Sequence, residues 1–286
     1  MWITYSLLSA LFSALCAILE KKALFKLAPF DFSLALYACL AALFAAAFLL
    51  TGGNFAAIGP RELASIYVKS LANVVSFLFI MNGIRRMELS AGLPLLLLAP
   101  ALVAVTAYAL FGDALSARQA GGIALITAGG YLLVRGRSGA GRAGDMRAYL
   151  YYCAALLVLT ASSLLNRYIL VSRNVPPLPF AAAEHLLALA NFLPAALLLR
   201  RSPAPALLAL RSAPLAIGGT AAGTALYRYF EVAAMAQASP ALVVALKRLS
   251  VVMAVLIGGK LFREKDVARR SAAALIMFAG VWLIIR

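Results

Sequence analysis

Hydrophobic residues gather in ten runs, each close to the length that crosses a membrane as a helix. A transmembrane α-helix needs roughly 20 predominantly apolar residues to span the hydrocarbon core. We predict five spans over residues 2–19, 32–50, 63–84, 89–111 and 119–134, and five more over 148–171, 180–199, 215–235, 241–261 and 268–285. The pattern therefore predicts an all-α membrane protein with ten transmembrane helices.

Two sets of five spans indicate an internal duplication. The predicted units are a first five-helix repeat over 1–134, a glycine- and arginine-rich linker over 135–147, and a second five-helix repeat over 148–286. Short segments match between the repeats, such as Met81-Asn82-Gly83 with Phe230-Glu231-Val232. An odd number of spans per repeat places the two repeats in opposite membrane orientations. Secondary transporters have this inverted-repeat architecture, with the substrate site near the membrane midplane between the halves.

Composition supports a membrane location and argues against several other classes of protein. The chain is 64% hydrophobic with a mean hydropathy of +0.95, and most of its 26 lysines and arginines lie at the ends of the apolar runs. Cations there suit membrane topology and lipid headgroups, so the net charge of +16 does not indicate a nucleic-acid partner. The three cysteines and one histidine lack metal-ligand spacing, and the chain has no phosphate-binding loop and no nucleophile–base pair. We expect no metal, no cofactor and no enzymatic activity.

Two adjacent cations, Lys247 and Arg248, lie inside the ninth predicted span. A charge at the centre of a spanning helix costs about 2.5–3.5 kcal/mol on insertion scales, so a counter-charge, a water-filled cavity or an anionic ligand must offset it. Adjacent residues point about 100° apart on a helix. One cation can therefore face a cavity while the other pairs with Glu231 or Glu184. The equivalent stretch of the first repeat, 95–98, is wholly leucine, which makes the predicted site one-sided.

Other polar side chains inside the spans are candidates for the same cavity. They are Asn73 and Asn82 in the third span, Glu184 and His185 in the seventh, and Thr224, Tyr227, Arg228 and Glu231 in the eighth. Thr224, Tyr227, Asn73 and Asn82 would supply hydrogen bonds to a substrate, while Glu231, Glu184 or His185 could couple transport to protons.

Several polar residues inside the spans also have a purely structural interpretation. Arg228 and Glu231 are three residues apart and can neutralise each other on one helix. A lone histidine is more often a packing residue than a proton carrier, and intramembrane serines often serve helix contacts. Lys69, near the start of the third span, could extend to the membrane surface.

These features together resemble the drug/metabolite transporter superfamily, and specifically its ten-span EamA-type transporters. The resemblance is carried by the short connectors before spans four and nine, by the acidic turns Gly112-Asp113 and Arg263-Glu264, and by the glycine-containing terminal helices. The family usually has Gly-Glu in these turns, so both copies depart slightly from its pattern. The Lys247–Arg248 pair also resembles the triose-phosphate translocators of the same superfamily, in which such a pair contacts the substrate phosphate.

The resemblance and the buried cations lead to one functional expectation. We expect a secondary transporter of the cell (inner) membrane that moves a small organic anion or zwitterionic metabolite by alternating access, as an exporter or exchanger. Its partners would be that metabolite, membrane lipid, and protons or a counter-substrate, with Lys247, Arg248 and Arg228 binding the anion. The alternative is a flippase for a lipid-linked anionic substrate.

The distribution of loop cations and the resemblance differ on where the termini lie. Apart from Lys69, Arg228, Lys247 and Arg248, the five cations Arg61, Arg118, Arg167, Arg173 and Arg286 are assigned to one side of the membrane, and the other seventeen to the opposite side. The positive-inside rule makes the richer side cytoplasmic and places both termini outside. The family resemblance implies cytoplasmic termini.

Overall fold

The computed structural model describes residues 1–24, 27–86, 96–135, 146–202, 204–250, 252–253 and 267–285, and all regular secondary structure in these residues is helical. The helices are α1 (Trp2–Leu24), α2 (Pro29–Leu50), α3 (Pro60–Arg86), α5 (Ala99–Phe111), α6 (Ala117–Arg135), α7 (Met146–Arg167), α8 (Pro177–Leu198), α9 (Ala204–Ser212), α10 (Pro214–Met235), α11 (Pro240–Lys247) and α13 (Val267–Ile285). Two short elements are the 3₁₀-turn η1 (Phe55–Ala57) and the π-turn η2 (Tyr168–Ser172). The all-helical prediction is confirmed for these residues.

Several helices begin at a proline, up to three residues before the predicted spans do. Proline is the first residue of α2, α3, α8, α10 and α11. Its fixed φ suits the first turn of a helix, and its missing N–H removes no intrahelical hydrogen bond there. The predicted spans started later because hydropathy marks the membrane core, whereas the helices continue into the polar interface.

Among the residues that the structure describes, five helical segments are long and apolar enough to cross a membrane. They are Trp2–Glu20, Phe30–Leu50, Pro60–Ile80, Tyr149–Ser172 and Pro177–Leu198. A sixth is present if α9 and α10, which meet at 99°, form one span, and Ala99–Phe111 and Ala272–Ile285 are shorter apolar helices. The total of ten spans stays a prediction, because parts of the fourth and ninth lie in 87–95 and 254–266, outside the described residues. The predicted linker 135–147 lies mostly in 136–145, also outside them.

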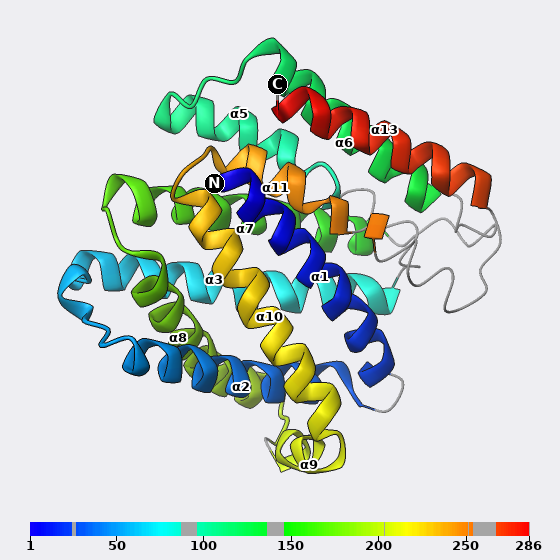
Figure 1. Cartoon of the computed structure of the whole chain (residues 1–286). Helices are drawn as coiled ribbons and strands as arrows, with labels where there is room; N and C mark the ends of the chain where they lie inside the picture. The colour runs from blue at the N-terminus through cyan, green and yellow to red at the C-terminus, as the bar shows by residue number, and fades with distance from the viewer. Residues whose placement is uncertain are drawn as a thin grey trace.

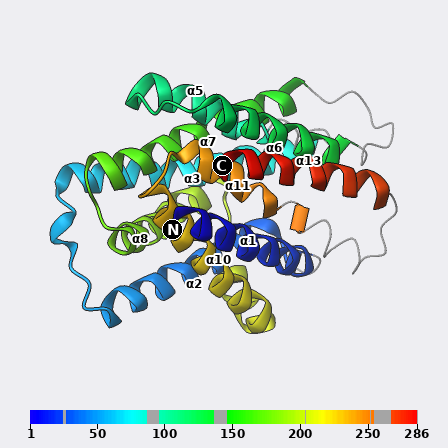
Figure 2. The same cartoon turned by 45° about the horizontal axis from the view of Figure 1, so that its top comes forward.

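The helices pair across the predicted halves in a symmetric way. α1 packs on α10 and α3 on α7, while α2 packs on α8, α5 on α11 and α6 on α13 (Figures 1 and 2). If the spans are numbered in order, these pairs are 1 with 8, 3 with 6, 2 with 7, 4 with 9 and 5 with 10. Exchanging the two halves leaves this set of pairs unchanged. The pairing is what an internal repeat would produce, although the repeat itself stays a prediction.

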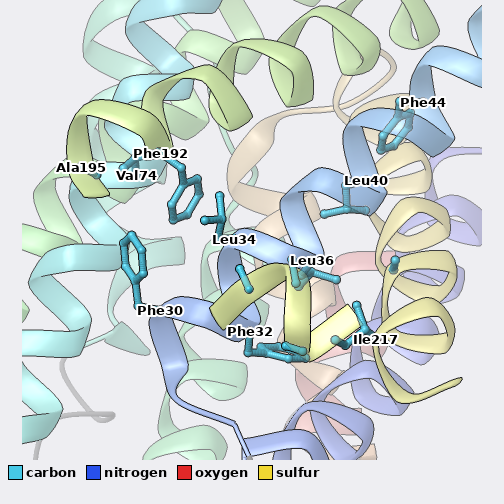
Figure 3. Close-up of a cluster of buried hydrophobic side chains, with 14 of the residues drawn as sticks. Phe30, Phe32, Leu34, Leu36, Leu40, Phe44, Val74, Phe192, Ala195 and Ile217 are labelled. Carbon is cyan, nitrogen blue, oxygen red and sulfur yellow. The ribbon is translucent and has the colours of Figure 1, made fainter. Parts of the chain in front are cut away.

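An aromatic and aliphatic cluster joins α2, α8 and the start of α10. Phe30 meets Phe192 edge-on, with ring centroids 6.0 Å apart, and Leu34, Leu40 and Ile217 fill the same region (Figure 3). Lipid tails are as apolar as leucine, so such contacts stabilise a membrane protein by close packing rather than by removing apolar surface from water. This cluster fixes the frame on which the polar residues of α8 and α10 are held.

Glycines bring α6 and α13 into backbone contact. A Cβ atom built at Gly122 would lie 2.6 Å from the carbonyl oxygen of Gly280, and one at Gly280 would lie 2.6 Å from that of Gly122. Small residues allow this approach between membrane helices. The neighbouring Gly121 has more room, since its nearest such atom, on Leu283, is 3.9 Å away.

Substituting Gly122 with alanine should therefore destabilise the protein, whereas Gly121→Ala should not. The clash is with backbone, which cannot rotate away, so the helices must separate, at a cost of about 1–3 kcal/mol. The thermal unfolding midpoints of the two variants in the same detergent measure the difference. Equal midpoints for both variants would show that α6 and α13 do not meet at Gly122.

Candidate functional site

A polar cavity of about 240 Å³ lies between the two predicted halves. Its walls come from α1, α3 and α5 of the first half and from α7, α10, α11 and the residues after α11 in the second. It is lined by Ser13, Lys69, Asn73, Ala99, Leu159, Ser162, Ser163, Asn166, Arg228, Glu231, Val244, Lys247, Arg248 and Ser250. This lining includes five of the residues predicted from the sequence: Asn73, Arg228, Glu231, Lys247 and Arg248.

The helix that carries the cation pair is interrupted at that pair. α11 ends at Lys247, and Arg248 lies in the turn that follows, its backbone N–H donating to the carbonyl of Ala245 at 3.0 Å. In the first half, a turn at Leu97 and Leu98 precedes α5 at the corresponding position. The ninth span was predicted as a continuous helix, and it instead contains a turn, as the fourth span does. Transporters place substrates at such breaks, because freed backbone groups and helix ends face a cavity there.

Glu231 holds two cations on one wall of the cavity. Glu231 Oε2 accepts a hydrogen bond from Lys247 Nζ at 2.7 Å and one from Arg228 Nη1 at 3.4 Å. Both cations also lie over the ring of Tyr227, with Lys247 Nζ 4.8 Å and Arg228 Cζ 5.3 Å from its centroid. The predicted pairing of Arg228 with Glu231 is therefore present. Of the two adjacent cations, Lys247 is the one that takes the carboxylate.

Arg248 has no carboxylate partner among the described residues. Its Nη2 donates to the carbonyl of Leu96 at 2.9 Å, next to the break in the fourth predicted span. Its Nε is buried and has no hydrogen-bond partner in the part of the chain that the structure describes. A guanidinium carries five N–H donors in a planar fork that matches an oxyanion. Arg248 therefore keeps a buried donor, Nε, that no described residue accepts from.

A second ion pair, between Lys69 of α3 and Glu184 of α8, lies deep in the wall. Lys69 Nζ donates to Glu184 Oε1, and only 2% of the lysine is exposed. The expectation that Lys69 could reach the membrane surface was wrong, because this carboxylate and the ring of Phe180, 5.4 Å from the ammonium, hold it inside. Asn73 Nδ2 donates to the same glutamate oxygen at 2.7 Å, and Ser162 Oγ donates to Asn73 Oδ1 at 2.9 Å. The network ties α3, α7 and α8 together.

The cavity carries more positive than negative charge. Four cations line it, Lys69, Arg228, Lys247 and Arg248. Three carboxylates oppose them: Glu231 in the lining, Glu184 behind Lys69, and Glu20 of α1, whose charge interacts with that of Arg228. Charges interact far more strongly in a low-dielectric interior than in water. Among the described residues the cations at this depth thus outnumber the carboxylates.

The other predicted residues lie outside this lining. Thr224 is buried against Cys16 of α1, with Oγ1 3.6 Å from Sγ, which is a packing contact between α1 and α10. His185 is buried, stacks on Phe44 with ring centroids 4.5 Å apart, and places Nδ1 2.8 Å from the carbonyl oxygen of Ala181. These contacts fit the packing interpretation of His185. Tyr227 lies beside the cavity under its cations, and the side chain of Asn82 is outside the described part of the chain.

Sequence reasoning missed the polar face of α7. Leu159, Ser162, Ser163 and Asn166 follow the i, i+3, i+4, i+7 spacing of one helix face, and all four line the cavity. The three- and four-residue steps of the sequence also predict a stripe of Thr160, Ser163 and Arg167, which is rotated by about one residue from the observed face. Thr160 is buried away from the cavity and bonds the carbonyl of Leu156. The i, i+4 pair of Ser162 and Asn166 was the signal that could have found this face.

Two further ion pairs join the halves near the end of α7. Arg167 forms a bidentate pair with Asp113, with Nε–Oδ2 and Nη2–Oδ1 distances of 3.0 and 2.9 Å. Arg173 Nε donates to Glu62 Oε1 at 2.6 Å, and this hydrogen bond raises the pKa of the Arg173 guanidinium. Between these arginines the helix widens into η2, whose backbone bond from Arg173 N to Tyr168 O closes a π-turn. These pairs connect the first and second halves at one end of the molecule.

Comparisons with known proteins agree with this architecture. A crystal structure of another protein superposes on the chain with a TM-score of 0.78, at 18% sequence identity, over 99% of this chain and 96% of that one, which shows a shared fold. No curated protein matches the chain in sequence. Neither result points to the triose-phosphate translocators. The family model of the EamA-like transporter family matches residues 1–135, a little under half of the chain, and this part of the chain is similar to that family.

Proposed function

We propose that the protein is a secondary transporter of a small organic anion or zwitterion, working by alternating access as an exporter or exchanger. The observation that carries the proposal is the cavity between the halves, where four cations outnumber the described carboxylates that interact with them. The similarity of residues 1–135 to the EamA-like transporter family supports a transport role. An anion would offset the cost of holding the unmatched charges inside the membrane.

The charged residues of the cavity would have different roles in binding that anion. Arg248 binds an oxyanion with its free donors, and Lys247 adds a point charge from the end of α11. Glu231 already pairs with Lys247 and Arg228, so it acts as the protein's own counter-anion in the cavity. An incoming anion replaces it. Glu231 is then the group that takes up a proton in coupled transport, whereas exchange of one anion for another needs no such step.

The size of the cavity limits the substrate. The cavity, of about 240 Å³, has room for small solutes such as three- and four-carbon acids.

Alternating access fits the arrangement of contacts between the halves. The symmetric helix pairs provide the surfaces on which one half rocks against the other. The Arg167–Asp113 and Arg173–Glu62 pairs hold the two halves together at one end, so they belong to a closed gate on that side of the cavity. Opening on that side requires both pairs to separate.

Transport of small carboxylates by the purified protein tests the proposal. We expect vesicles that contain the protein and are loaded with unlabelled lactate to accumulate radiolabelled lactate by exchange, and empty vesicles not to do so. Glycerol, which has similar size and no charge, serves as the control solute. The proposal is wrong if neither lactate, alanine, propionate nor inorganic phosphate exchanges above the rate of protein-free vesicles.

An apolar groove between α5 and α6 supports a second candidate, a flippase for a lipid-linked anion. The groove encloses about 540 Å³ and includes Leu98, Ala101, Val105 and Ala124. Leu98 and Ala101 flank Ala99, which lines the polar cavity. An acyl chain in the groove would place its anionic headgroup near the start of α5. Flipping of a fluorescent anionic lipid in the same vesicles, without exchange of the soluble acids, would favour this function over the first.

A further inference from the structure

Asn166 carries a buried hydrogen-bond acceptor that nothing in the described part of the chain satisfies. The residue lines the cavity, is 8% exposed, and its Oδ1 has no hydrogen-bond partner there. Its Nδ2 lies 3.3 Å from Met235 Sδ. A thioether sulfur accepts hydrogen bonds and cannot donate them, so the amide nitrogen must face it and the oxygen is the free end.

Neighbouring groups on α7 also present acceptors. Ser162 Oγ gives its proton to Asn73 Oδ1, and Ser163 Oγ gives its proton to the carbonyl of Leu159. Each hydroxyl oxygen keeps its lone pairs, and both residues line the cavity. The α7 wall therefore offers acceptors, while the wall formed by Arg228, Lys247 and Arg248 offers charged donors. A ligand that satisfies both walls carries hydrogen-bond donors on the side facing α7 and negatively charged acceptors on the side facing the cations.

We propose that Asn166 is a specificity residue, and that the substrate is a small carboxylate that also carries an N–H or O–H donor. The carboxylate faces the cations, and the hydroxyl or ammonium group donates to Asn166 Oδ1. The inference rests on the proposed function and narrows it. A buried acceptor left unpaired carries a penalty of its own, so a site built around one rejects ligands that lack the donor.

Three acids of nearly equal size test the proposal: propionate, which has no donor, lactate, which has a hydroxyl, and alanine, which has an ammonium group. We expect the dissociation constant of at least one of lactate and alanine for the purified protein to be about tenfold or more below that of propionate. The stronger binder of the two identifies the donor. In Asn166→Leu that preference should fall to about twofold or less, while propionate binds about as in the parent protein.

Two further variants separate specificity from folding. Thr160→Val changes a buried polar residue of the same helix that does not line the cavity, and it should keep the preference. Asn166→Asp keeps an acceptor at nearly the same volume, and it should still bind the acid that the parent protein prefers, lactate or alanine, more tightly than propionate. Equal binding of all three acids by the parent protein, or a preference that survives Asn166→Leu, would overturn the role of Asn166. Binding of none of them would instead count against the proposed function.

Discussion

Replacing Glu184 with glutamine is expected to destabilise the protein by about 3–5 kcal/mol, the range found when one partner of a buried ion pair is removed. Glutamine keeps an oxygen that can accept the hydrogen bond from Asn73, so the variant removes little besides the charge. The ammonium of Lys69, 2% exposed, is then left in the wall without its counter-ion. The thermal unfolding midpoint and the fraction of protein that stays monodisperse in detergent measure the loss.

A second substitution distinguishes this mechanism from general damage to α8. In Lys69→Met/Glu184→Gln neither charge remains, and we expect the double variant to be more stable than Glu184→Gln alone. Glu62→Gln is the matched control. It removes a carboxylate whose partner, Arg173, is 36% exposed, so its midpoint should change much less. A double variant less stable than Glu184→Gln would mean that Lys69 is stabilised by something other than Glu184.

Replacing Arg248 with methionine is expected to weaken the binding of a small carboxylate by about 30-fold or more. Truncating one partner of a buried charge pair costs about 2–5 kcal/mol, and Arg248 has no resident carboxylate to share the loss. Arg248→Lys keeps the charge and loses the planar fork, so its affinity for the carboxylate should lie between those of the parent protein and Arg248→Met. Binding of lactate followed by calorimetry supplies the measurement.

Replacing Lys247 should affect anion binding differently from replacing Arg248, because Lys247 pairs with Glu231. In Lys247→Met the carboxylate of Glu231 loses its partner at 2.7 Å and keeps Arg228 at 3.4 Å, so the site carries less positive charge. We expect anion binding to be weakened in this variant and partly restored in Lys247→Met/Glu231→Gln. Arg118→Gln, which changes an exposed arginine outside the cavity, is the control. If Arg248→Met and Lys247→Met both bind lactate like the parent, the cation pair is structural.

The sequence predicted the helices and the place of the cation pair beside a cavity better than it predicted the partners of each residue. Hydropathy located the apolar segments, since bilayer thickness fixes their length. Proline then set where α2, α3 and α8 begin, which hydropathy alone does not report. The break at Arg248 could not be foreseen, because no proline or glycine marks it and its hydrogen bond to Leu96 joins residues from opposite halves of the chain.

Contacts between distant helices explain the remaining differences. Lys69 looked like a residue near a membrane surface because its partner, Glu184, is 115 positions away. Asn166 was passed over because the serine stripe on α7 was placed about 100° from the face that lines the cavity. Helical periodicity gives the relative direction of side chains on one helix. Only the packing of α7 on α3 shows which of those directions points into the cavity.

The position of a bound anion tests the central claim most directly. Crystals of the protein soaked in selenate, an oxyanion with a strong anomalous signal, report where negative charge settles. We predict a selenium peak in the cavity, within hydrogen-bonding reach of Arg248 and Lys247, that is absent from crystals of Arg248→Met. Selenium peaks confined to the outer surface, with the cavity empty at saturating selenate, would contradict the account.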